Sequence, residues 1–307
     1  MLETDVAPGI HRLQHASTNL YLVEHDDRVL VVDAGLPAVW RELQEALRQL
    51  GRTPDDVDGV LLTHAHFDHV GTVRRVRGEW RRPVWVHPAD ERLVRHPYRY
   101  AHERARLSYP LRYPAALPAL WRMARAGALT VRGIDDATVL TAVTPFPGRA
   151  VVVPTPGHTA GHVALHLPER DAVIVGDAIV TLDPYTGATG PQIVAGAATA
   201  DSQEALRSLD ALVATGAGTV LPGHGDPWTQ GIGDAVAAVL TGQLLAYTGA
   251  TGPQIVAGAA TADSQEALRS LDALVATGAG TVLPGHGDPW TQGIGDAVAA
   301  ARRVGAH

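Results

Sequence analysis

The chain has 307 residues, of which 46% are hydrophobic, and a formal net charge of −7, so it can bury the core of one large or two ordinary domains. It contains no cysteine, which excludes disulfides, thiolate metal ligands and a cysteine nucleophile. No apolar run approaches the ~20 residues of a membrane span and the N-terminus does not resemble a signal peptide, so we expect a cytoplasmic protein without a membrane partner.

The first elements alternate between strands and a helix. LYLVEH (20–25) and RVLVVDAG (28–35) predict paired strands with a tight Asp-Asp turn. Residues 38–50 predict a helix, because the leucines fall on one face. GVLLTHAH (59–66) predicts a buried strand that ends in a polar cluster, and PVWVH (83–87) predicts another strand.

Residues 90–130 predict a helical insert that is interrupted by several prolines. The surrounding stretch, 71–132, carries 14 arginines against four acidic residues. This basic segment indicates either an anionic ligand nearby or arginines on solvated helix faces. Within the insert, arginines alternate with tyrosines: Arg92, Arg95, Arg99, Arg104, Arg106 and Arg112 with Tyr98, Tyr100, Tyr109 and Tyr113.

Three further strands follow, over AVVVPTPGH (150–158), VALHL (163–167) and AVIVGDA (172–178). Residues 199–215 predict a helix, and GTVLPGHG (218–225) predicts a final strand that ends at a histidine. This alternation of strands and helices is typical of an α/β fold.

Residues 185–238 recur without a single change at 247–300. Two unchanged copies indicate a recent duplication, or an artefact of cloning or assembly, because solenoid repeats diverge and number at least three. Removing one 62-residue period leaves 245 residues, an ordinary α/β domain. We therefore predict a catalytic domain over 1–238, a joint at 239–246, a surplus copy at 247–300 and a tail at 301–307.

The sharpest signal is THAHFDH at 63–69, which places His64, His66, Asp68 and His69 within six residues. Neutral imidazole is the commonest protein ligand for metals, and buried imidazoles and carboxylates need partners. A solvated histidine-rich loop is the alternative.

Three other histidine or aspartate positions lie at the ends of predicted strands. They are His158, Asp177, and either His224 or its repeated counterpart His286. Each is weak alone. Together they supply three histidines for one metal and an Asp-His-His set for a second, with Asp177 able to bridge.

The ordered motifs H-x-H-x-D-H, G-H-T-x-G-H, G-D and G-H-G, between about residue 8 and residue 238, resemble those of the metallo-β-lactamase-fold hydrolases. The resemblance implies a four-layer αββα sandwich with two zinc ions at one edge, although iron or manganese also suit such ligands. It implies that His64, His66 and His158 hold the first ion, that Asp68, His69 and His224 hold the second, and that Asp177 bridges.

The resemblance also implies a mechanism in which a metal-bound hydroxide attacks a carbonyl, with Asp68 orienting the hydroxide and moving a proton. Asp33 and His162 would position ligands without binding metal. His87 is either a positioning residue or purely structural.

The substrate is a small molecule whose identity the ligand motifs do not fix. The insert favours an ester, thioester or lactone with an acyl chain and an anionic tail, and the glyoxalase II-like group is the nearest analogy. The alternatives are a mononuclear iron persulfide dioxygenase, a phosphodiesterase on the same fold, and a non-catalytic binding protein. The negative net charge argues against a nucleic-acid partner.

Spacing favours His224 over His286, because loop-closure entropy disfavours the longer connection from Asp177. The surplus copy could pack outside the fold or enter the site of a second chain, which would produce a swapped homodimer.

Overall fold

The computed structural model describes residues 1–106, 109–141, 146, 150–248 and 291–304, together with 271, 275–276, 278–279 and 282. The chain divides into two units, Met1–Val236 and Ala237–His307. The first unit contains the sheets.

The larger sheet has seven strands among the described residues, in spatial order from β1 to β7. They are β1 (Leu2–Ala7), β2 (Ile10–His15), β3 (Thr18–His25), β4 (Arg28–Val32), β5 (Val57–Leu61), β6 (Val84–Val86) and β7 (Thr138–Val139). Strands β1 to β4 are antiparallel, whereas β4 to β7 are parallel. The carboxyl ends of β4 to β7 therefore meet at one edge.

The second sheet has the order β13-β10-β9-β8. Its strands are β8 (Val151–Pro154), β9 (Val163–Leu167), β10 (Ala172–Gly176) and β13 (Thr219–Pro222), and β11 (Val180–Leu182) pairs separately with β12 (Thr189–Gln192). Because β9 is antiparallel to both neighbours and β13 is parallel to β10, strands β8, β10 and β13 run in the same direction.

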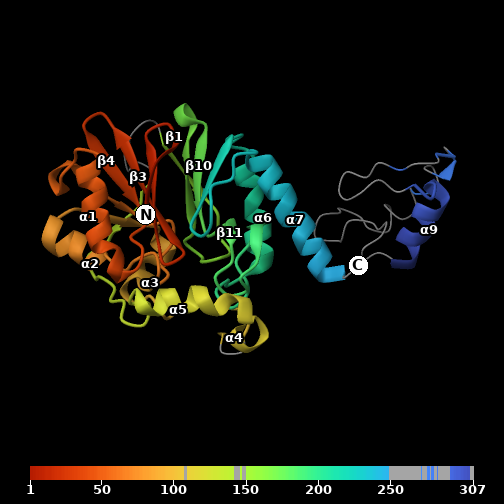
Figure 1. Ribbon diagram of the computed structural model, residues 1–307, viewed down its shortest axis with the longest axis horizontal. Helices are drawn as coiled ribbons and strands as arrows, with labels where there is room; N and C mark the ends of the chain where they lie inside the picture. The colour runs from red at the N-terminus through yellow and green to blue at the C-terminus, as the bar shows by residue number, and fades with distance from the viewer. Residues whose placement is uncertain are drawn as a thin grey trace. The chain divides into compact units, whose positions relative to one another are not determined.

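The two sheets pack face to face through buried aliphatic side chains. Leu30 and Val32 of β4 share one core cluster with Leu165 of β9 and Ile174 of β10. Figure 1 shows α1 and α2 on the outer side of the larger sheet and α6 on the outer side of the smaller one. The predicted four-layer αββα sandwich is therefore confirmed.

Eight α-helices occur among the described residues. They are α1 (Trp40–Gln49), α2 (Val73–Arg75), α3 (Glu91–Arg95), α4 (Tyr109–Arg112), α5 (Leu117–Arg125), α6 (Ser202–Val213), α7 (Ile232–Thr248) and α9 (Ile294–Val304). Helix α6 begins where Asp201 accepts a hydrogen bond from the backbone N–H of Glu204. Among the described residues, no helix combines the length and the apolar character that crossing a membrane requires.

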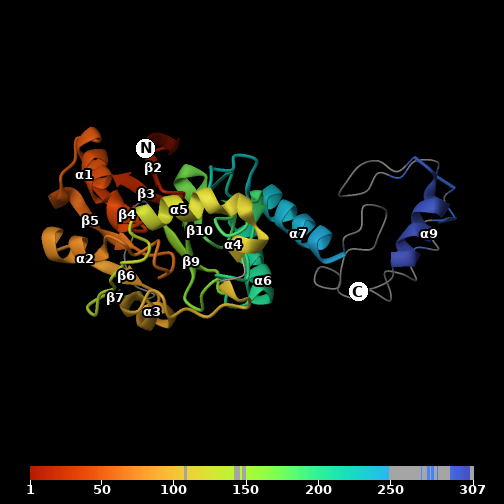
Figure 2. The ribbon, with the colours of Figure 1, turned by 60° about the horizontal axis from the view of Figure 1, so that its bottom comes forward.

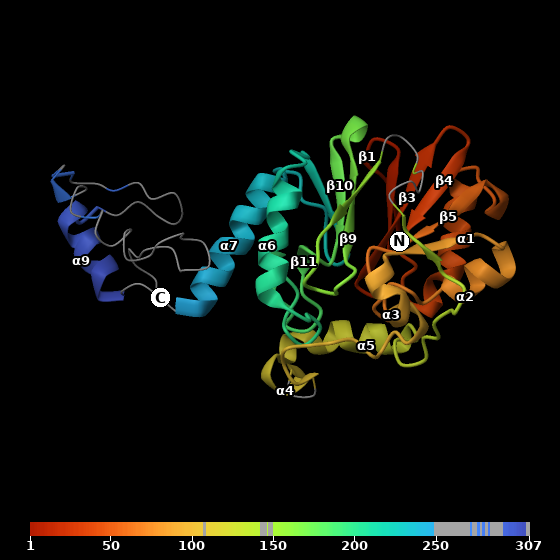
Figure 3. The ribbon, with the colours of Figure 1, turned by 180° about the vertical axis from the view of Figure 1, so that it is seen from behind.

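The predicted helical insert consists of α3, α4 and α5, and Figures 2 and 3 show α5 lying along one edge of the sandwich. The strand predicted over 59–66 ends earlier, at Leu61. The backbone N–H of Thr63 donates to the Asp33 carboxylate, 2.8 Å away, instead of to a neighbouring strand. The histidines that follow therefore lie in a loop.

The two copies share the same local backbone around their matched isoleucines but differ at their starts, where Tyr185 and Thr186 lie in a turn whereas Tyr247 and Thr248 end α7. The N–H of Ile232 donates to the carbonyl of Ala217, and that of Ile294 donates to Ala279, at 2.9 and 2.8 Å. Helices α7 and α9 begin at these matched isoleucines. The predicted joint, 239–246, lies within α7, and most of the surplus copy falls outside the described residues.

From the packing between the sheets we predict how far two leucine variants differ in their free energy of unfolding. Leu165→Ala should lower the free energy of unfolding by about 2–5 kcal/mol, because it leaves a cavity in the core between the sheets. Leu111→Ala, at an 89% exposed position on α4, should change it by less than about 0.5 kcal/mol. Urea unfolding measures both, and equal effects would contradict the face-to-face packing.

Candidate metal centre

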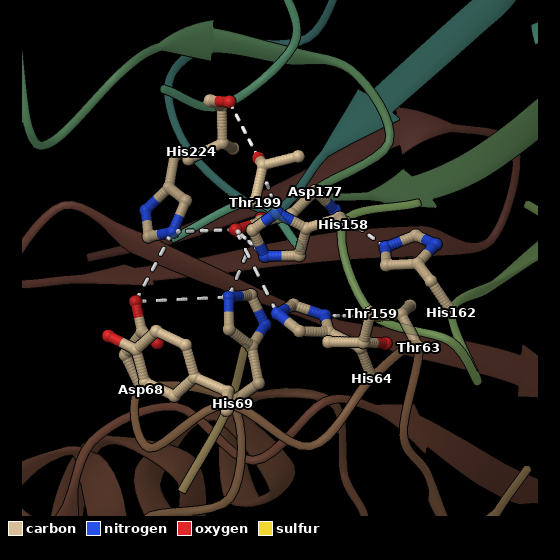
Figure 4. A network of polar contacts seen from close by, with 12 residues as sticks. Thr63, His64, Asp68, His69, His158, Thr159, His162, Asp177, Thr199 and His224 are labelled. Atoms are coloured by element: carbon tan, nitrogen blue, oxygen red, sulfur yellow. Dashed lines mark hydrogen bonds and ion pairs between the residues drawn. The ribbon is translucent and has the colours of Figure 1, made fainter. Parts of the chain in front are cut away.

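The candidate site lies where the carboxyl ends of strands from both sheets meet. Strands β8, β10 and β13 lead into loops that carry His158, Asp177 and His224. The loop that follows β5 in the larger sheet, 62–69, carries the remaining histidines and Asp68. Figure 4 shows the labelled side chains from these loops converging on one space.

The structure brings together all seven side chains that the sequence suggested as ligands. Their ligand atoms form three overlapping groups, and within each group the atoms lie no more than 4.8 Å apart. The groups are His64, His66 and His158; His64, His69 and Asp177; and Asp68, His69 and His224. All seven side chains are buried. His286 lies outside the described residues.

The Asp177 carboxylate is shared between the groups. Its Oδ2 atom lies 3.4 Å from Nε2 of His158 and 3.3 Å from Nε2 of His224. Its Oδ1 atom lies 3.5 Å from Nε2 of His69. Two ligand atoms that are both about 2.1 Å from one tetrahedral zinc ion lie about 3.4 Å apart, so these separations fit ligands of common ions.

Several polar atoms in this cluster are buried without a hydrogen-bond partner among the described residues. They are Nε2 of His64, His66, His69 and His158, and Oδ1 of Asp177. Such atoms are costly to bury unless something else binds them. Imidazole nitrogen and carboxylate oxygen are ligands that zinc, iron and manganese accept, so the residues present fit a divalent metal.

Asp33 fixes two of the histidines. Its carboxylate accepts hydrogen bonds from the Thr63 hydroxyl and from Nδ1 of His69, at 2.8 and 2.9 Å. Because the Thr63 hydroxyl donates to Asp33, it accepts from Nδ1 of His64, 3.0 Å away. Both rings therefore present Nε2, rather than Nδ1, to the site, and the neutral form of each ring would offer its lone pair there. The positioning role predicted for Asp33 would use these hydrogen bonds.

His158 and His224 are oriented in the same way. Nδ1 of His224 donates to the backbone carbonyl of Ser17 at 2.6 Å. The Thr199 hydroxyl donates to the carbonyl of Val194, so it accepts from Nδ1 of His158 at 3.3 Å. In both histidines Nε2 faces the space that the aspartates share.

Burial keeps one group of histidines neutral. It lowers the pKa of His64 and His158 well below the ordinary range, and neighbouring imidazoles lower it further. Burial also lowers the pKa of His66, to about 4. These three rings, the predicted ligands of the first ion, are therefore available as neutral ligands at pH 7.

The other group sits among carboxylates. Burial by itself lowers the pKa of His69, but Asp177, Asp33 and Asp68 raise it to about 9. The same balance, dominated by Asp177 and Asp68, raises the pKa of His224 well above its ordinary value. A metal ion that binds here displaces protons from these rings.

His162 lies beside the site but its ring nitrogens are occupied. Nε2 accepts from the backbone N–H of Asp177 at 3.1 Å, and Nδ1 lies 2.7 Å from the Thr155 hydroxyl. It can therefore hold Asp177 in place but offers no lone pair to a metal. His87 instead accepts the N–H of Ala89 and caps a short 3-10 turn, which agrees with the structural alternative.

Asp90 is a buried residue of the site that the sequence reasoning missed. Its carboxylate accepts from the N–H of Ala65 at 3.1 Å, from the Thr159 hydroxyl at 2.7 Å and from the N–H of Gly161 at 2.9 Å. It therefore ties the His64–His69 loop to the loop that carries His158. Its position just after β6, whose carboxyl end lies at the same edge as that of β5, was the available signal.

Comparison with known proteins gives consistent matches. A family model described as the metallo-beta-lactamase superfamily matches residues 15–224. The probable metallo-hydrolase YflN of Bacillus subtilis (strain 168) is 26% identical over 243 residues, covering 73% of this chain and 87% of YflN.

Two solved structures are also similar. A di-iron-bound form of TTHA1623 is 27% identical with a TM-score of 0.52, over 74% of this chain and 96% of that one. The metallo-beta-lactamase family protein TTHA1429 from Thermus thermophilus is 25% identical with a TM-score of 0.53, over 89% of this chain and 84% of that one.

The duplicated histidine provides a matched pair of variants. His224→Ala should remove about half of the bound metal, because His224 belongs to only one of the two predicted ligand sets. His286→Ala, in the same eight-residue context LPGHGDPW, should leave the metal content unchanged. Elemental analysis after dialysis measures both. Full metal content in His224→Ala that disappears in the double variant would show that His286 replaces it.

Proposed function

The chain belongs to the metallo-β-lactamase superfamily, and from this premise we propose that it is a two-metal hydrolase of an ester, thioester or lactone carbonyl. The observation that carries the proposal is the position of the Asp177 carboxylate, within 3.5 Å of ring nitrogens from both predicted ligand sets. A carboxylate placed in this way can bridge two ions. A one-ion site would not need the second set of buried, converging ligands.

In this proposal the ligands divide as the motifs imply. The first ion would be held by His64, His66 and His158 and the second by Asp68, His69 and His224, and Asp177 would serve both. Bound divalent ions lower the pKa of a water ligand towards neutrality and polarise the carbonyl under attack. Zinc is the proposed metal, and the di-iron form of TTHA1623 supports iron as the alternative.

Asp68 is the proposed proton acceptor. Burial alone would raise the pKa of this carboxyl, but His69 and His224 lower it, so Asp68 is ionised at neutral pH. Its Oδ2 atom lies 3.3 Å from Nε2 of His224. A carboxylate oxygen held at this point can orient the attacking water and accept its proton.

Metal analysis combined with a panel of substrates tests which class of reaction the protein catalyses. Zinc-, iron- and manganese-loaded protein is assayed on matched aryl esters, thioesters, lactones and bis-aryl phosphodiesters. We expect turnover of the carbonyl substrates. Turnover of phosphodiesters alone, or oxygen uptake with a persulfide by iron-loaded protein, would replace the proposal with one of the alternatives.

Asp68→Asn tests the proton acceptor. An amide keeps the shape of the side chain but has no charge and a far lower proton affinity, so kcat should fall about a hundredfold or more. Asp27→Asn, at a fully exposed side chain, serves as the matched control and should leave kcat unchanged. Metal content measured in both proteins separates a loss of chemistry from a loss of ions, and wild-type kcat in metal-loaded Asp68→Asn would refute the role.

A further inference from the structure

Two tyrosines from distant parts of the chain meet beside the candidate metal centre. Tyr100 belongs to the insert, and Tyr185 lies in the turn between β11 and β12. Their hydroxyl oxygens are 3.2 Å apart. The ring of Tyr100 lies 4.1 Å from the ring of His66, centroid to centroid, so the pair borders the ligands of the proposed first ion.

The hydrogen bond between the two tyrosines uses only one of their two hydroxyl hydrogens. Each tyrosine keeps its hydrogen at neutral pH, because the ordinary pKa of its hydroxyl is about 10. The bond between the two oxygens uses one of the two hydrogens. The structure gives neither hydroxyl another acceptor among the described residues, so the second hydrogen is available to an oxygen atom of a ligand.

Arg106 adds a positive charge to the same place. Its guanidinium carbon lies 4.5 Å from the centroid of the Tyr100 ring, in a cation-π arrangement, and the side chain is half-buried. Within the part of the chain that the structure describes, no carboxylate forms an ion pair with it. By contrast, Arg95 of the same insert forms an ion pair with Glu91.

These three residues share one chemistry. The spare hydroxyl hydrogen and the guanidinium both favour oxygen atoms that carry negative charge. They lie on the side of the site formed by the insert and the turn between β11 and β12, next to His66. Building on the proposed function, we propose that Tyr100, Tyr185 and Arg106 select acyl substrates with a carboxylate group: Arg106 pairs with the carboxylate, and a tyrosine hydroxyl donates to an oxygen near the scissile carbonyl.

The proposal is tested with two aryl esters that differ only in charge, the 4-nitrophenyl monoester of glutarate and the 4-nitrophenyl ester of pentanoate. Wild-type protein should prefer the glutarate ester by about tenfold in kcat/KM. Arg106→Gln should remove that preference through KM, because the carboxylate is bound equally in the ground and transition states. Arg99→Gln, an exposed arginine of the same insert, should keep it.

For the tyrosines we expect single and double variants to differ in activity. Either Tyr100→Phe or Tyr185→Phe leaves one hydroxyl that can still donate, so each single variant should lose little activity. The double variant has no donor and should lose about tenfold in kcat on both esters. Wild-type kcat in the double variant would refute the tyrosine part.

A binding experiment separates this proposal from the proposed function. The anilides N-phenylglutaramate and N-phenylpentanamide match the acyl groups but resist hydrolysis, so calorimetry reports their binding directly. Selective binding of the glutaramate that depends on Arg106 would support the proposal even if neither ester is hydrolysed. Equal binding of both anilides by the wild type, or a preference that Arg106→Gln leaves unchanged, would overturn it.

Discussion

The Asp177 carboxylate is buried within 3.9 Å of ring nitrogens from four histidines, and much of the structure serves to hold it there. A buried charge needs partners, and removing one partner leaves the other charge uncompensated. The raised pKa of His224 and the lowered pKa of Asp177 are two views of this mutual dependence. The backbone N–H of Asp177 donates to Nε2 of His162, and this bond helps to hold the carboxylate in position.

A second set of buried hydrogen bonds, from β3 to the loop after β13, holds one repeated copy in the fold. Asn19 and Tyr21, on β3 of the larger sheet, both donate to the carbonyl of Pro222 at the end of β13, at 2.9 and 2.7 Å. Asn19 also donates to the carbonyl of Gly225, so the His224 loop is clamped on both sides. These donors occur in a part of the chain that is not repeated, so only one copy of the segment can use them at a time.

The parts of the site that the sequence predicted are those encoded locally. THAHFDH carries four candidate ligands in one loop, and the remaining ones follow strands that hydrophobic runs identify. The partners of those ligands were harder to find, because Thr199 and Asp90 reach the site only through tertiary contacts. Tyr185 shows the same limit: its neighbour Tyr100 is 85 residues away in sequence.

The insert lies beside the candidate metal centre, where Tyr100 contacts His66, and it is tied to the sandwich at both ends. One end is anchored by Asp90, whose carboxylate bonds to both ligand loops. The other end returns to the same place, where the N–H of Ile134 donates to the carbonyl of Val94 on α3. Gly133 permits this approach, since a Cβ atom there would lie 2.0 Å from that carbonyl oxygen. With both ends fixed and the candidate ligands carried by loops at strand ends, the proposed substrate contacts of the insert can vary while the arrangement of those ligands is kept.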